Sequence, residues 1–211
     1  MADQRAQAAR LTTLPNLLGL LRIAATPVVI VLLLQPFAGA GLLAAIVFGV
    51  AAATDFVDGR IARSRGQVTP LGVFMDLTAD KVLVAGVLIG LVEVDLLPTW
   101  MVAILVLREL VVQGVRQVAA GAAVVMPAGS LGKGKTLATL VGIELVLLSF
   151  DAASGGPLSS LGAGAEAALY NVGYWVLIAA TALSVVSGWE YIRAALPVLT
   201  GHETGERPPA T

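Results

Sequence analysis

Cysteine and histidine are almost absent from this sequence. The 211 residues include no cysteine, which excludes disulfide bonds, a thiolate zinc site and a cysteine nucleophile. The single histidine, His202, lies in a polar stretch close to the last residue and leaves little room for a histidine-based triad or a histidine-ligated metal. Chemistry carried out by this chain must therefore depend on carboxylates, arginine and lysine.

Charged side chains are also scarce. They make up 13% of the chain, against 57% for hydrophobic residues, whereas a typical soluble domain carries about 25% charged residues. This balance argues against a soluble globular enzyme and against a disordered protein. The 13 Lys and Arg are matched by 14 Asp and Glu, so the chain also lacks the basic excess of a nucleic-acid-binding protein.

Long apolar stretches are present instead. A helix needs about 20 mostly apolar residues to cross the hydrocarbon core of a bilayer, and a spanning backbone must satisfy its hydrogen bonds internally. Six stretches approach that length, so we predict an all-α integral membrane protein with six transmembrane helices. The stretches are residues 17–34, 42–53, 71–91, 96–112, 137–150 and 170–186.

The positive charges predict how these helices are oriented. Lys and Arg gather around the start of the first stretch, around the second and fourth connections, and after the sixth stretch, while the other three connections contain none. Because such residues stay on the cytoplasmic side, both termini are predicted to be cytoplasmic. The chain then divides into a cytoplasmic or interfacial leader (1–13), a membrane catalytic domain (14–197) and a cytoplasmic tail (198–211).

Four aspartates lie where the second and third stretches meet the cytoplasm. Asp55 and Asp58 are three residues apart and Asp76 and Asp80 are four apart, so each pair falls on one face of a helix. If the helices face each other, four carboxylates converge, and their repulsion and desolvation are costly. Two divalent cations, Mg²⁺ or Mn²⁺, would cancel these charges, and two such ions suit phosphoryl transfer.

Residues with little or no side chain share these faces. Gly59 and Ala62 accompany the first pair of aspartates and Gly72 the second, which leaves room for a bulky ligand against the helix backbone. Each feature alone has an ordinary explanation, because acids at a helix end are often solvated and small residues often pack helices together. Their combination on two matching faces, with Arg63 beside them, favours a binding site.

The same segment resembles the signature of the CDP-alcohol phosphotransferase family, D-x2-D-G-x2-A-R-x8-G-x3-D-x3-D. The resemblance implies the six-helix fold of that family, a homodimer, and two divalent metals held by the four aspartates. It also implies a CDP-linked donor bound by the signature residues up to Gly72, with Asp76 in the catalytic site and Asp80 as general base toward the acceptor hydroxyl. Every specified position is present: Asp55, Asp58, Gly59, Ala62, Arg63, Gly72, Asp76 and Asp80.

Other segments are similar to the phosphatidylglycerophosphate synthase branch of that family. They are residues 13–22, Arg108-Glu109 with Arg116, residues 132–136 and residues 187–191. This resemblance implies phosphatidyl transfer from CDP-diacylglycerol to glycerol 3-phosphate, with phosphatidylglycerol phosphate and CMP as products. Where that branch usually has a bulky aromatic residue between two lysines, this chain has Gly134.

The dianionic phosphate of such an acceptor needs fixed cations near the aspartates. Arginine suits bidentate phosphate recognition, and lysine acts as a point charge. The alternative is that these cations are ordinary positive-inside residues, which is the weaker explanation for the two arginines because they lie farther inside an apolar context. The four candidates are Arg108, Arg116, Lys133 and Lys135.

Three alternatives stay open at the level of sequence. A member of the same family could use inositol phosphate as acceptor, or phosphatidylglycerol as in cardiolipin synthesis. A cation transporter is a remote alternative, since transport favours acids near mid-span and repeat symmetry. Residues 129–136 also satisfy the phosphate-loop pattern G-x4-G-K-[ST], but that loop requires a preceding strand in a soluble domain.

Overall fold

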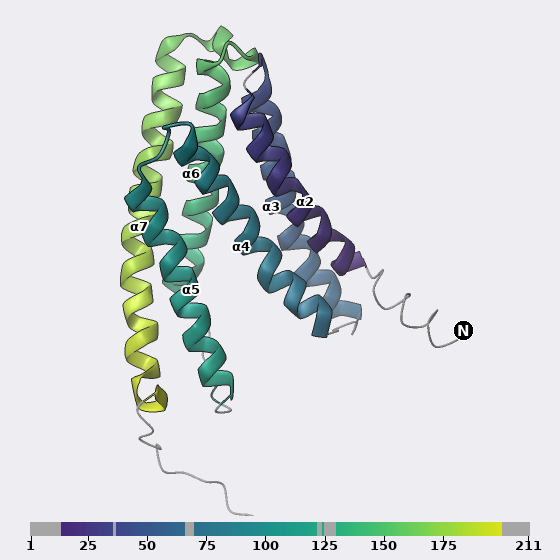
Figure 1. The fold of residues 1–211 in the computed structure, drawn as a ribbon, viewed down its shortest axis with the longest axis vertical. Coiled ribbons are helices and arrows are strands. Elements are labelled where there is room, and N and C mark those ends of the chain that lie inside the picture. The colour runs from purple at the N-terminus through teal and green to yellow at the C-terminus, as the bar shows by residue number, and fades with distance from the viewer. Residues whose placement is uncertain (1–13, 36, 66–69, 122–123, 125–129, 200–211) are drawn as a thin grey trace, which may run out of the picture.

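The computed structural model describes residues 14–35, 37–65, 70–121, 124 and 130–199. Within its helices, the side chains of residues 14–16, 55–65, 70–77, 130–131, 163 and 198–199 lie outside the described set. The described backbone forms six α-helices and one short 3-10 helix without any strand, as the prediction of an all-α chain requires (Figure 1). The elements are α2 (Leu14–Leu34), α3 (Ala40–Arg65), α4 (Pro70–Glu93), α5 (Thr99–Gly121), α6 (Ser130–Ala153), η1 (Pro157–Leu161) and α7 (Ala163–Leu199).

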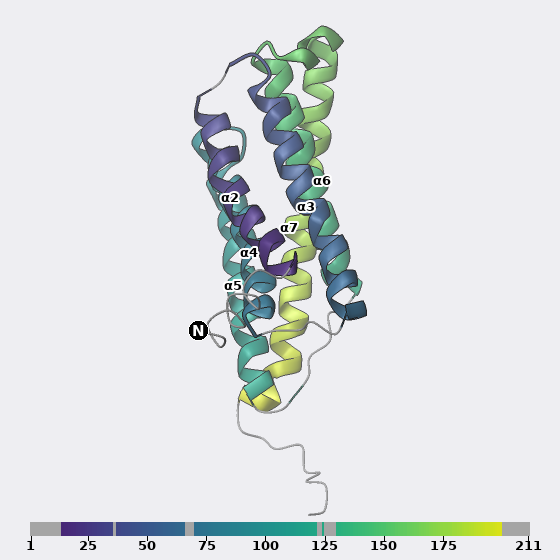
Figure 2. The same cartoon turned by 90° about the vertical axis from the view of Figure 1, so that its right-hand side faces the viewer.

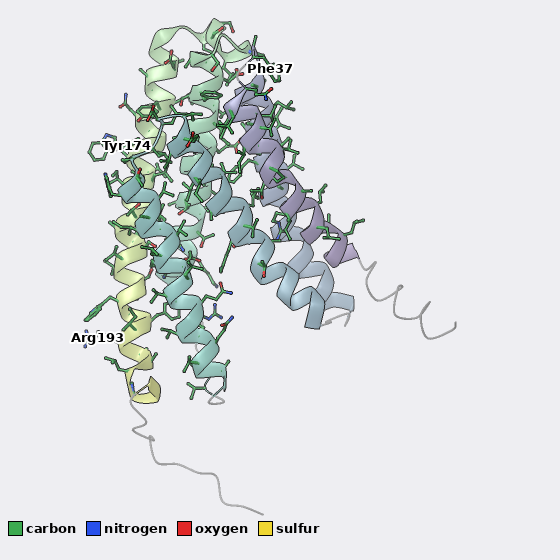
Figure 3. All side chains as sticks on the ribbon, viewed as in Figure 1. Phe37, Tyr174 and Arg193 are labelled. Carbon is green, nitrogen blue, oxygen red and sulfur yellow. The ribbon has the colours of Figure 1, made fainter. Side chains whose placement is uncertain are left out.

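The α-helices run alternately up and down, so their connections fall toward two ends. The α2–α3, α4–α5 and α6–α7 connections lie toward one end, and the start of α2 and the end of α7 lie toward the other (Figures 1 and 2). Phe37, in the first connection, and Arg193, near the end of α7, mark the two ends (Figure 3). The connections at the Phe37 end contain no Lys or Arg, which agrees with the grouping predicted from the positive charges.

The helices pack in two connected groups. α2 packs against both α3 and α4, while α7 packs against α5 and α6, and α3 and α6 join the groups. The core is built from fully buried apolar side chains such as Leu33, Phe48 and Leu83. Gly142 allows α6 and α7 to approach closely, because a Cβ at this position would lie 2.6 Å from the Leu177 side chain. Close approach at small residues is how helices in lipid gain packing energy.

A buried carboxylate ties three elements together at the Phe37 end. Asp151, in the last turn of α6, is fully buried. Its Oδ1 accepts a hydrogen bond from the Leu42 backbone N–H at the start of α3, and its Oδ2 accepts one from the Leu158 N–H in η1, each at 3.0 Å. The carboxylate therefore satisfies two backbone donors at helix starts, where the helices themselves supply no acceptor.

The described part of the chain has the character of a membrane protein. Large apolar side chains are exposed along its helices, as on a surface that faces lipid. By length and composition, three helices could span a bilayer, in the segments Leu17–Leu34, Gly132–Ala153 and Gly164–Pro197. The apolar part of α3 is shorter, Ala40–Thr54. α4 and α5 carry charged side chains within their length, so six crossings stay a prediction.

Candidate active site

The four signature aspartates are carried by the neighbouring ends of α3 and α4. Asp55 and Asp58 lie in the last three turns of α3, and Asp76 and Asp80 in the first three turns of α4. Both segments are helical, as their spacing predicted, and both helices pack against α2. Only the Asp80 side chain is among those described, so convergence of the four carboxylates stays a prediction. The other signature side chains outside the described set are those of Gly59, Ala62, Arg63 and Gly72.

No group of three or more potential metal-ligating side chains occurs within the described residues. The side chains of Asp55, Asp58 and Asp76 lie outside this set. The four signature aspartates therefore stay the predicted metal site.

A buried arginine lies beside the aspartate segment of α3. The Arg22 side chain, on α2, is 1% exposed, and its Nε donates a hydrogen bond to the Ala51 carbonyl at 3.3 Å. Ala51 precedes Asp55 by one helical turn. Arg22 thus brings a fixed positive charge to the level at which the acidic segment begins.

Asp80 lies between two cavities of different character. One is a cavity of about 700 Å³ that several charged side chains line, and the other is a mostly apolar cavity of about 350 Å³. Both volumes are in the range of small-molecule sites. The residues that line both cavities are Asp80, Lys81, Glu109, Gln113 and Thr136.

The larger cavity, called here the polar pocket, gathers positive charge from three helices. Lys81 comes from α4, Arg108 and Arg116 from α5, and Lys133 from α6. The carboxylates that line it are Asp80 and Glu109. Among the described residues, Arg116 and Lys133 have no ion-pair partner, and both are exposed. Three of the four cations predicted from sequence thus line one pocket together with Asp80.

Lys135 lies apart from the other three predicted cations. Its side chain is 8% exposed and is absent from the linings of both cavities. Lys135 Nζ forms an ion pair with the Glu109 carboxylate. Direct binding of the acceptor phosphate by Lys135 stays a prediction, and its buried pairing favours an indirect role.

Arg108 is held in position by α7. Its Nε donates to the Ser184 carbonyl at 3.0 Å, and its Nη2 donates to Ser187 Oγ at 2.8 Å. Gly188 leaves space for the arginine, because a Cβ added there would lie 3.0 Å from Arg108 Cγ. The guanidinium is therefore fixed between α5 and α7 at the wall of the polar pocket.

The smaller cavity, called here the apolar cavity, is lined by α4 and α5 and, through Thr136 and Thr139, by α6. Its walls include Val84 and Leu88 from α4, and Leu105 and Val106 from α5. It begins at Asp80 and Lys81 and continues along α4 toward the Phe37 end. A polar and an apolar compartment thus meet at Asp80, as the binding of a lipid with a charged headgroup requires.

The phosphate-loop alternative is wrong. Residues 130–136 belong to α6, and Thr136 Oγ donates to the Gly132 carbonyl within the same helix at 3.1 Å. A phosphate loop needs a strand before the helix, and the described part of the chain contains none.

A model of the CDP-alcohol phosphatidyltransferase family matches residues 12–186, which include the aspartates of both helices. The chain belongs to this family. Its membership confirms the resemblance found in the signature, and it replaces the transporter alternative with transferase chemistry. Tyr191, which lines the polar pocket, and Ser187 and Gly188, which contact Arg108, follow the matched segment.

Individual relatives in the CDP-alcohol phosphatidyltransferase family are similar along most of their length. A Bacillus subtilis protein named CDP-diacylglycerol–glycerol-3-phosphate 3-phosphatidyltransferase is 39% identical, over 84% of this chain and 92% of its own. A Pseudomonas fluorescens protein of the same name is 34% identical, over 88% and 91%. A Mycobacterium tuberculosis protein named probable phosphatidylglycerophosphate synthase is 35% identical, over 94% and 88%.

Sequence reasoning assigned no role to Glu109. An acid inside an apolar stretch is itself a signal of function in a membrane protein, and Glu109 stands beside Arg108 in such a stretch. Its partners could not be predicted, because Lys81 and Lys135 come from helices on either side of it in the sequence.

Proposed function

We propose that this CDP-alcohol phosphatidyltransferase transfers the phosphatidyl group of CDP-diacylglycerol to glycerol 3-phosphate, giving phosphatidylglycerol phosphate and CMP. The observation that carries the proposal is the polar pocket, where cations from three helices surround a space that Asp80 also lines. A phosphorylated acceptor explains these charges better than a neutral alcohol does. The names of the three relatives agree, since each concerns glycerol phosphate as acceptor or phosphatidylglycerophosphate as product.

The reaction is a direct displacement at phosphorus. The free primary hydroxyl oxygen of glycerol 3-phosphate forms a bond to the phosphorus of the phosphatidyl group, and the bond from this phosphorus to the CMP oxygen breaks. Asp80 accepts the hydroxyl proton as general base. The chain has no cysteine, and its one histidine, His202, is more than 100 residues from the aspartates in the sequence, so a direct route is favoured over a covalent enzyme intermediate.

Asp55, Asp58, Asp76 and Asp80 would hold two divalent cations, Mg²⁺ or Mn²⁺. A set of four carboxylates on two neighbouring helices fits hard cations that prefer oxygen ligands. When bound, these ions would neutralise charge on the pyrophosphate and stabilise the leaving oxygen. Gly59, Ala62, Arg63 and Gly72 would bind the CDP part of the donor on the same helix faces.

The acceptor phosphate would lie in the polar pocket among Arg108, Arg116 and Lys133. Arg108 is pre-oriented by Ser184 and Ser187, so little conformational freedom is lost when the phosphate binds. The acyl chains of the donor would stay on the apolar side of Asp80. A phosphatidylglycerol acceptor, as in cardiolipin synthesis, has no terminal phosphate to engage these cations, and inositol phosphate is kept as the second acceptor to be tested.

We further propose the arrangement in the membrane that the positive charges predict. Six helices cross the bilayer, both termini and the active site face the cytoplasm, and residues 14–197 form the catalytic domain. The protein works as a homodimer, as the family resemblance implies.

A CMP-release assay with purified protein in CDP-diacylglycerol micelles tests the proposed function. We expect CMP release that requires glycerol 3-phosphate, is lost on exhaustive chelation, and returns with Mg²⁺ or Mn²⁺. Asp76→Asn should reduce the rate by at least 100-fold, because a metal ligand is lost. Asp95→Asn is the matched control, since Asp95 lies in the distant α4–α5 connection with φ of 58°, which Asn tolerates. Equal turnover with inositol phosphate would contradict the assigned acceptor.

A further inference from the structure

One carboxylate connects three helices at the polar pocket. The Glu109 carboxylate, on α5, accepts from Arg108 Nη1 at 2.5 Å and from Lys81 Nζ, on α4, at 3.4 Å. It also pairs with Lys135 Nζ, on α6. Arg108 is in turn bonded to α7 through Ser184 and Ser187. A network centred on Glu109 therefore includes side chains or backbone of four helices.

The Glu109 network lies where it can link α4 to α5. The apolar cavity separates these two helices on one side of Lys81 and Glu109, and the polar pocket opens on the other. Among the described residues, Lys81–Glu109 is the only ion pair between α4 and α5. The pair thus links the helix that carries Asp80 to the helix that carries Arg108.

The charges in the network match the charge of the proposed acceptor. Three cations and one carboxylate leave two net positive charges, equal in size to the charge of a phosphate dianion. The Lys135 side chain, at 8% exposure, would be a buried charge without a partner if Glu109 were neutral. Without the carboxylate, the three cations would also repel one another and separate.

We infer that Glu109 is a positioning residue that holds Lys81 and Arg108 in one arrangement around the phosphate of the acceptor, with Lys135 as its buried counter-ion. This inference rests on the proposed function and adds to it a residue that acts through the cations it holds. The carboxylate acts through the cations, so its loss affects binding of the anionic acceptor more than binding of the donor.

Steady-state kinetics for both substrates test this inference. Glu109→Gln should raise the KM for glycerol 3-phosphate by about tenfold or more, the effect of losing one charge-assisted hydrogen bond, while the KM for CDP-diacylglycerol changes less than twofold. Glu109→Asp keeps the charge and should recover part of the acceptor KM. Glu93→Gln is the matched control, because Glu93 is exposed at the opposite end of α4.

A second pair of variants covers the case in which Glu109→Gln does not fold. Lys135→Met removes the buried cation, so the double variant Lys135→Met/Glu109→Gln contains no unpaired buried charge. The acceptor KM of this double variant should still exceed that of Lys135→Met alone by about tenfold, because Lys81 and Arg108 have lost their shared partner.

Three outcomes are decisive, and they separate the inference from the proposed function. The inference is overturned if the KM for glycerol 3-phosphate is unchanged or lower both in Glu109→Gln against the wild type and in the double variant against Lys135→Met. The carboxylate would then only offset the charge of the neighbouring cations. A wild-type protein that releases no CMP with glycerol 3-phosphate overturns the proposed function itself. A rise in the KM for both substrates to the same extent also contradicts a role specific to the acceptor.

Discussion

At the scale of single residues, Gly188 determines where the Arg108 side chain can lie. Gly188→Ala places a methyl group 3.0 Å from Arg108 Cγ, although alanine in a helix interior is favoured over glycine by about 0.5–1 kcal/mol. We therefore expect a KM for glycerol 3-phosphate raised several-fold without a loss of melting temperature. Steady-state kinetics and a thermal unfolding scan in detergent measure the two effects.

Gly114→Ala is the control for this substitution. Gly114 is also inside a helix, and an added Cβ meets no atom within 4 Å. It should keep the wild-type KM. Identical acceptor KM values for Gly188→Ala, Gly114→Ala and the wild type would show that Arg108 does not need the space above Gly188.

The two lysines illustrate which parts of the site could be predicted from sequence. The sequence predicted two cations on the cytoplasmic side, Lys133 and Lys135. It did not predict that Lys133 lines the polar pocket while Lys135 is buried and does not. Residues two apart on a helix point in nearly opposite directions, and α6 begins at Ser130, well before the apolar stretch at 137. The glycine-rich segment gave no sign that it is helical, so both lysines were expected at the same pocket.

At the scale of elements, Asp151 fixes the start of α3 and of η1 against the end of α6. Asp151→Ala would leave the Leu42 and Leu158 N–H groups without their acceptor. The loss of two hydrogen bonds to a carboxylate should lower the free energy of unfolding by about 3 kcal/mol or more. We expect a markedly lower melting temperature in detergent, with Asp95→Asn as the control, and an unchanged melting temperature would contradict the capping role.

The helices were largely predictable, whereas their ends and neighbours were not. Each apolar stretch lies within a helix, except that the stretch 96–112 begins three residues before α5, because burial in lipid or in the core requires apolar side chains over most of a helix. The polar ends of α3 and α5, up to Arg65 and Gly121, lie beyond those stretches. The aspartate helices α3 and α4 both pack against α2, an arrangement that helical spacing alone does not specify.

At the scale of the whole molecule, the absence of cysteine makes the predicted orientation testable. Single cysteines can be placed at Ser160, exposed in η1, and at Arg193, exposed at the opposite end in α7 (Figure 3). In intact cells, a membrane-impermeant maleimide should label Ser160→Cys at once and Arg193→Cys only after permeabilisation. The reverse pattern, or equal labelling of both, would contradict cytoplasmic termini.

The contacts that α7 makes with Arg108 indicate how the choice of acceptor could be altered. Ser187 and Gly188, which contact Arg108, and Tyr191, which lines the polar pocket, lie past the segment matched by the family model. A graft of residues 187–199 from a relative with another alcohol would replace these contacts while leaving every aspartate in place. We therefore expect that exchanging this short segment of α7 changes which acceptor alcohol the enzyme prefers.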